Sequence, residues 1–154
     1  MKIHGKTYDE PRVETVVIPR NGGDIIFKAK AILDYEPFEA LCPGPMAPMV
    51  MRKGGEQFRD VEDAKFKTKV NEWAHNRTNW MIIESLKATD GLEWETVDPK
   101  NPTTWDNYIV ELTKANFSNA EINRIVECVI DANGLNQKRI DEATERFLAG
   151  QAQR

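Results

Sequence analysis

A segment rich in proline and glycine divides this sequence into two parts of different character. Residues 43–55 contain three prolines and three glycines in thirteen positions. Proline lacks the backbone N–H that a helix needs, and glycine makes the chain costlier to order, so this segment excludes a regular helix. We therefore expect an extended linker or arm at residues 43–60, between an N-terminal β-hairpin region at 1–42 and a helical domain at 61–154.

The N-terminal region is predicted to form a β-hairpin. The runs 13–18 and 25–32 are rich in β-branched and aromatic residues, and Asn21-Gly22 between them supplies the positive φ angles that a tight turn needs. In the second run, lysine alternates with Phe27 and two alanines, which predicts one wet face and one buried face. Two strands alone are marginal in water, so the hairpin is expected to pack on helices, to gain a strand or to meet a partner.

A short helical turn with Pro37 at its first position is expected before the arm. After residue 60 the hydrophobic period becomes helical, and Asp60 is expected to cap a long helix from Val61 to Lys87. The apolar stripe of that helix is predicted to contain Phe66, Val70, Trp73, Trp80 and Ile83.

Three further helices are expected beyond residue 104. The first contains Tyr108. The second begins at the capping box Ser118-Asn119-Ala120-Glu121 and ends at Gly134, and the third follows a cap at Asn136 and ends at Gly150. The last helix is predicted to turn four apolar side chains inward: Ile140, Ala143, Phe147 and Leu148. The predicted fold class is therefore α+β, a hairpin or small sheet followed by a bundle of about four helices.

No pattern for chemistry occurs in the sequence, so we expect no catalytic, cofactor-binding or metal site. The zinc patterns HExxH and CxxC and the nucleotide-binding glycine patterns are missing. Cys42 and Cys128 are expected to be reduced. The first ten residues lack the apolar core of a secretory signal, and no apolar run approaches the roughly 20 residues of a membrane span, so a cytosolic protein without membrane contact is expected.

Charge argues against nucleic acid as the general partner. Residues 1–60 are balanced, so the whole net charge of −4 lies in residues 61–154. A helix-turn-helix could be formed around residues 133–136, with Lys138 and Arg139 opening its second helix, but three carboxylates follow at once and would repel phosphates. A DNA-binding regulator is therefore a minor alternative, and an enzyme comes last.

The order of several segments, and the residues within them, resemble those of the small tail assembly chaperones of long-tailed bacteriophages. The resemblance covers roughly Glu14 to Gln151. Its segments are the hairpin, Phe38-Glu39-Ala40-Leu41-Cys42-Pro43, the arm, the long Trp-containing helix, Gly91-Leu92-Glu93-Trp94-Glu95-Thr96-Val97-Asp98, Trp105, Phe117-Ser118-Asn119-Ala120-Glu121-Ile122-Asn123-Arg124 and Phe147-Leu148-Ala149-Gly150-Gln151.

The resemblance implies a helical protein without enzymatic activity. Such proteins bind the tape-measure protein and keep it soluble while tail-tube subunits are recruited, in the cytoplasm of the infected bacterial host, and they are typically absent from the finished particle. The family supplies no catalytic residues to carry over. A virion structural or adaptor protein is the alternative, and self-association into a homo-oligomer is left open.

The arm is the segment in which we expect partner contacts. Its methionines are flexible apolar groups on a stretch too rich in proline to form core elements, although the arm could instead drape over the chain's own helices. The residues expected at partner contacts are Phe38, Leu41, Met46, Met49, Val50, Met51 and Trp94.

Overall fold

The computed structural model of the chain describes residues 1–152 and has the expected α+β architecture. The described residues form three two-stranded antiparallel sheets, five α-helices and one short 3-10 helix at Pro102–Thr104. The first sheet, β1 (Lys2–Ile3) with β2 (Lys6–Thr7), is a very small hairpin whose residues are all exposed. The other two sheets are the predicted hairpin and, unexpectedly, the arm.

The predicted N-terminal hairpin is confirmed as β3 (Val13–Ile18) paired with β4 (Ile25–Lys30). Its inner face is buried at Ile18, Phe27 and Ala29, as the alternation of residue types predicted. The prediction of a tight Asn-Gly turn between these strands is wrong. A six-residue connection joins the strands, because Ile18 pairs with Ile25, and the positive φ of 127° falls on Gly23 instead.

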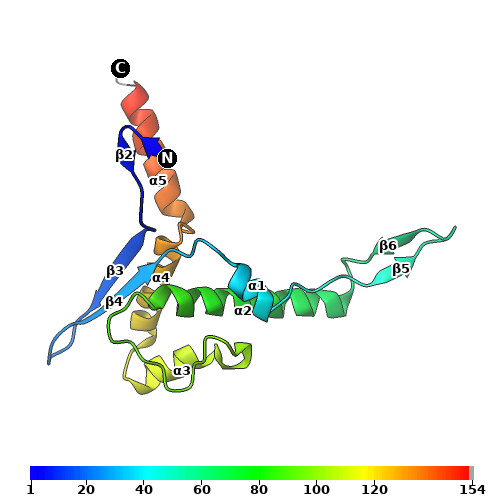
Figure 1. Ribbon diagram of the computed structural model, residues 1–154, viewed down its shortest axis with the longest axis horizontal. Coiled ribbons are helices and arrows are strands. Elements are labelled where there is room, and N and C mark those ends of the chain that lie inside the picture. Colours follow the sequence, from blue (N-terminus) through cyan, green and yellow to red (C-terminus); the bar gives the residue numbers. More distant parts are fainter. Residues whose placement is uncertain (153–154) are drawn as a thin grey trace.

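The core lies where this hairpin meets two helices, α2 (Ala64–Leu86) and α4 (Asn119–Ala132). Both strands pack against α4, and β4 also packs against α2, so helices cover one face of the hairpin (Figure 1). The largest fully buried side chains are Trp105, Phe38, Ile18, Ile82, Ile83, Leu86, Ile125 and Val129. The hairpin therefore gains its stability from helices rather than from a third strand.

Only the C-terminal part of α2 belongs to the core. Its buried residues lie between Asn79 and Leu86, whereas the preceding part of its apolar stripe, which includes Trp73, is only half-buried. The helix begins at Ala64 rather than Val61, because the carboxylate of Asp63 accepts a hydrogen bond of 2.9 Å from the Phe66 N–H and caps it. The part of α2 before Trp73 thus extends beyond the packed core (Figure 1).

The sequence signals at both ends of α4 are confirmed. Ser118 and Glu121 exchange the two hydrogen bonds of a capping box. At the other end Gly134 has a φ of 68°, its N–H donates to the Asp131 carbonyl, and the Leu135 N–H donates to the Ile130 carbonyl. These two bonds form a Schellman motif, which explains the glycine as a helix stop.

The last helix, α5 (Gln137–Ala152), departs from the prediction. Asn136 caps it as expected, but the helix runs past Gly150, and every side chain described in it is exposed. Ile140, Phe147 and Leu148, which were expected to point inward, are 45%, 63% and 58% exposed. The helix therefore projects from the end of α4, and its apolar residues lie outside the core (Figure 1).

Candidate partner-binding surfaces

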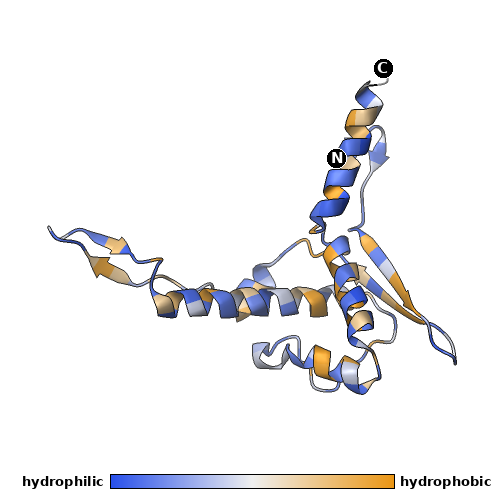
Figure 2. Cartoon of the chain, turned by 180° about the vertical axis from the view of Figure 1, so that it is seen from behind, coloured by the Kyte–Doolittle hydropathy of each residue, from blue (hydrophilic) through white to orange (hydrophobic). Residues whose placement is uncertain are grey.

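The arm is a β-hairpin rather than an extended linker. β5 (Met49–Met51) pairs with β6 (Gln57–Arg59), and the Arg52 N–H donates to the Glu56 carbonyl at 2.7 Å to close the loop. Gly54 and Gly55 in that loop have φ angles of 103° and 87°, a region that favours glycine. The arm extends from the free end of α2, away from the core (Figures 1 and 2).

The arm keeps its methionines in solvent. Met46, Met49 and Met51 are 72%, 49% and 71% exposed. On the opposite face Val50 pairs with Phe58, both are half-buried, and the Arg52 guanidinium lies 4.3 Å from the centroid of the Phe58 ring. The arm therefore does not drape its methionines over the chain's own helices.

Phe38 belongs to the core, so the prediction that it contacts a partner is wrong. It lies in α1 (Glu36–Leu41), which has a proline in its first turn as predicted. Its side chain is 0% exposed, and its ring centroid lies 5.7 Å from that of Trp73, 5.7 Å from that of Trp80 and 6.1 Å from that of Trp105. Leu41, at the end of the same helix, is 38% exposed. The short helix thus delivers one aromatic anchor to the core and leaves its last leucine accessible.

Trp94, the seventh expected contact residue, lies at a second surface far from the arm. It is half-buried and lines an open groove of about 790 Å³ between β4, residues 89–95 and α3 (Asn107–Lys114). The apolar residues of this groove are Ile25, Ile26, Phe27, Leu92, Trp94, Leu112, Ala115 and Phe117. A concave apolar surface of this size is typical of binding sites.

One carboxylate, that of Glu111, fixes the wall of this groove. It accepts hydrogen bonds from the N–H groups of Glu95, Thr96 and Val97 at 2.6, 3.1 and 3.1 Å, and from the Thr96 hydroxyl at 2.8 Å. Partial burial disfavours the charged form of Glu111, but these hydrogen bonds outweigh it and hold its pKa below the ordinary value. The loop that carries Trp94 is therefore preorganised.

The rim of the groove is acidic. Its titratable residues are Asp24, Asp90, Glu93, Glu95 and Glu111, against Lys28 and Lys114. The Lys28 ammonium lies 3.7 Å from the Asp90 carboxylate, and Glu111 is engaged by the loop. Asp24, Glu93 and Glu95 are exposed, which leaves an anionic rim around an apolar floor.

An ion pair stabilises one end of the groove. Arg20 and Glu121 meet at 2.5 and 3.1 Å, and the Arg20 guanidinium lies 4.8 Å from the centroid of the Phe117 ring. Hydrogen bonds from Arg20 and from the Ser118 N–H lower the pKa of Glu121 to about 2. This contact joins the hairpin loop to the start of α4, so its function is structural.

Sequence reasoning missed a third apolar surface, the stripe on α5. Ile140, Phe147 and Leu148 recur at helical spacing on this exposed helix. Figure 2 shows apolar bands along α5. The spacing itself indicated an apolar face, but spacing does not show whether the rest of the chain covers that face.

Two further groups of titratable residues within residues 1–152 lie outside these surfaces. His75 Nε2 lies 2.7 Å from an Asp106 oxygen that also accepts a bond of 2.6 Å from Asn79. Burial raises the pKa of the Cys42 and Cys128 thiols, which disfavours the nucleophilic thiolate. Within residues 1–152 no group of three or more His, Cys, Asp or Glu side chains is arranged to hold a metal ion.

Comparison with family models, curated proteins and solved structures gives no match for the chain. Among the described helices, none combines the length and apolar character that crossing a bilayer requires.

Proposed function

We propose that the chain is a non-catalytic tail assembly chaperone of a long-tailed bacteriophage, which binds the tape-measure protein and helps recruit tail-tube subunits. The sequence resemblance supports this assignment. The structural observation that carries it is the arm, which holds Met46, Met49 and Met51 in solvent at the end of a long helix. Its site of action is then the cytoplasm of the infected host, before the particle is complete.

Physical chemistry explains why such an arm suits a chaperone. A long helical client exposes apolar stripes until it assembles, and it aggregates unless those stripes are covered. Methionine is unbranched and polarizable, so a few methionines adapt to many apolar surfaces without one fixed geometry. The acidic remainder of the chain keeps the complex soluble, because net charge opposes association.

The arrangement of the projections favours one alternative, a virion adaptor protein. The arm, the β3–β4 hairpin and α5 extend in different directions from one core (Figure 1), as contacts to several neighbouring subunits would require. The protein composition of purified particles separates the two functions, because a chaperone leaves and an adaptor stays.

The experiment that locates the client surface replaces Met46, Met49 and Met51 together by serine. We expect co-purification with the tape-measure protein to fall severalfold while the thermal unfolding midpoint stays unchanged, because exposed side chains contribute little to folding. The matched control replaces three exposed apolar residues of α5 by serine, namely Ile140, Phe147 and Leu148. Loss of the client from the α5 variant but not from the arm variant would assign the contact to α5 instead.

A further inference from the structure

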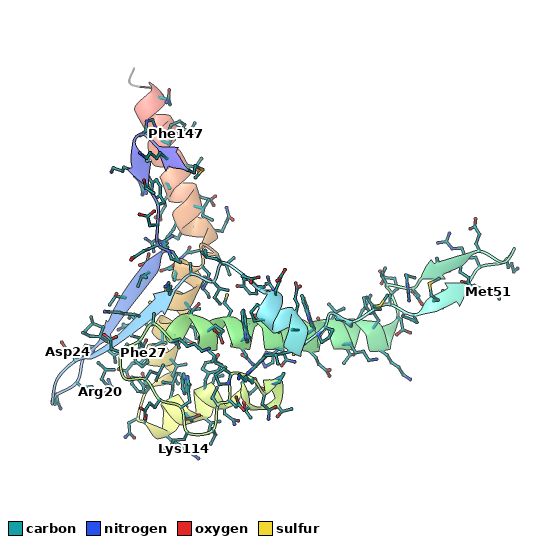
Figure 3. All side chains as sticks on the ribbon, viewed as in Figure 1. Arg20, Asp24, Phe27, Met51, Lys114 and Phe147 are labelled. Atoms are coloured by element: carbon teal, nitrogen blue, oxygen red, sulfur yellow. The ribbon has the colours of Figure 1, made fainter. Side chains whose placement is uncertain are left out.

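Two of the candidate surfaces, the arm and the groove at Trp94, lie at opposite ends of α2. The arm precedes Ala64, and residues 89–95, which form one wall of the groove, follow the end of the helix at Leu86. Figure 3 shows Met51 at the tip of the arm, with Asp24, Phe27 and Lys114 of the groove region at the other end of the molecule.

The charges of these two surfaces are opposite. The arm, residues 43–60, carries Arg52, Lys53 and Arg59 against Glu56 and Asp60, and its tip, residues 49–55, carries Arg52 and Lys53 without an acid. The groove carries five acids and two lysines, and one of those lysines already pairs with Asp90. Apolar contacts match as well, because exposed methionines lie beside the basic residues of the arm, and the groove has an apolar floor.

The arm cannot reach the groove of its own chain. The 23 residues of α2 separate them, a helix of about 34 Å at 1.5 Å per residue. The arm is joined to the start of that helix by a short link, and its own hairpin extends further outward (Figure 1). Any contact between the two surfaces therefore joins two copies of the chain.

We propose that the tip of the arm of one copy docks in the acidic groove of a second copy. Met51 lies against the apolar floor around Trp94, while Arg52 and Lys53 meet the carboxylates of Glu93 and Glu95. The contact is head-to-tail, since each copy offers an arm at one end and a groove at the other. Repetition of such a contact gives a ring if the rotation closes and an open chain if it does not.

The preorganised wall of the groove supports this assignment. Glu111 holds residues 95–97 through four hydrogen bonds, so the loop carrying Trp94 is ordered before an arm arrives. Ordering a binding loop in advance lowers the entropy cost of docking. Met51 serves both proposals, but the charge variants used below leave Met46, Met49 and Met51 in place, so assembly is tested separately from client binding.

The test is a charge exchange followed by sedimentation velocity over a range of protein concentrations at low salt. One variant carries Arg52→Glu and Lys53→Glu in the arm, and a second carries Glu93→Lys and Glu95→Lys in the groove. Each alone places like charges in contact, and we expect at least about tenfold weaker association than the wild type. Because Lys2 and Lys6 are exposed on a separate hairpin, Lys2→Glu with Lys6→Glu is the matched control and should associate as the wild type does.

The decisive sample is an equimolar mixture of the arm variant and the groove variant. In that mixture the arm of each variant can meet a groove of opposite charge on the other variant, so assembly should return, whereas each variant alone keeps the weakened association. Circular dichroism verifies that all variants are folded. A wild type that stays monomeric at every concentration, variants that assemble like the wild type, a control pair that also abolishes assembly, or a mixture that fails to assemble would each overturn the proposal.

Discussion

Replacing Phe38 by alanine distinguishes a core residue from a binding residue. The side chain is 0% exposed and packs among the three rings of Trp73, Trp80 and Trp105. Cutting a buried phenylalanine to alanine costs about 3–5 kcal/mol, from lost burial and from the cavity that remains. For a chain of this length each kcal/mol lowers the unfolding midpoint by about 2–4 °C, so we expect a decrease of about 6–20 °C.

The assay is urea unfolding followed by circular dichroism, together with a thermal scan. Phe147→Ala is the matched control, because it removes the same group from a side chain that is 63% exposed and should change the free energy of unfolding by less than about 0.5 kcal/mol. A loss below about 1 kcal/mol for Phe38→Ala, well under the range for buried aromatics, would refute the packing of α1 on α2. Equal losses for the two variants would show that α5 is also packed.

Three further perturbations test the groove, the ion pair and the exclusion of nucleic acid. Glu111→Ala should lower the free energy of unfolding by about 1–3 kcal/mol, because the partly buried Val97 N–H loses its acceptor. Trp94 fluorescence should shift as the loop is released. Glu111→Gln retains an acceptor and should cost less. Glu121 has a folded pKa of about 2 against an ordinary 4.5, so the stability it contributes to the fold is present above pH 4.5 and is lost as the pH falls through about 2. Glu121→Gln should remove that part of the acid sensitivity in unfolding curves measured across this pH window. Duplex DNA should not bind at physiological salt, because the helical half carries the excess acid, and a gel shift at sub-micromolar protein concentration would reverse this view.

Local signals in the sequence predicted the elements whose structure is decided locally. The capping box at Ser118 and the helix stop at Gly134 depend on residues close in sequence, and both are present. The alternation of residue types also predicted the buried face of β4. Such features depend on backbone hydrogen bonds and on the period of the side chains, and both are decided by residues that are neighbours in the sequence.

Prediction failed where tertiary context decides the outcome. The stripe of Ile140 and Phe147 was assigned to a core, but period alone does not supply the surface that would cover it. The prediction that Phe38 contacts a partner is wrong, because its position in a short helix does not show that three tryptophans distant in sequence enclose its side chain. The pair Gly54-Gly55 between two short runs indicates a hairpin in the arm, but the three prolines that precede it favour an extended segment.

The candidate surfaces were only partly predictable for the same reason. The methionines of the arm could be selected from composition, since a segment without core elements leaves its apolar groups accessible. The groove at Trp94 could not, because it joins residues near 25, 92 and 112 that only the fold brings together. Its preorganisation depends on Glu111, a residue without any distinguishing sequence pattern.

Under the proposed function, the arm keeps an aggregation-prone client soluble. The most direct measurement is the soluble fraction of the tape-measure protein of the same phage, expressed alone, with the wild-type chain, or with the chain in which Met46, Met49 and Met51 are serine. We predict a client that is insoluble alone, soluble with the wild type and again largely insoluble with the arm variant. A client whose solubility is the same in all three cases would contradict the account.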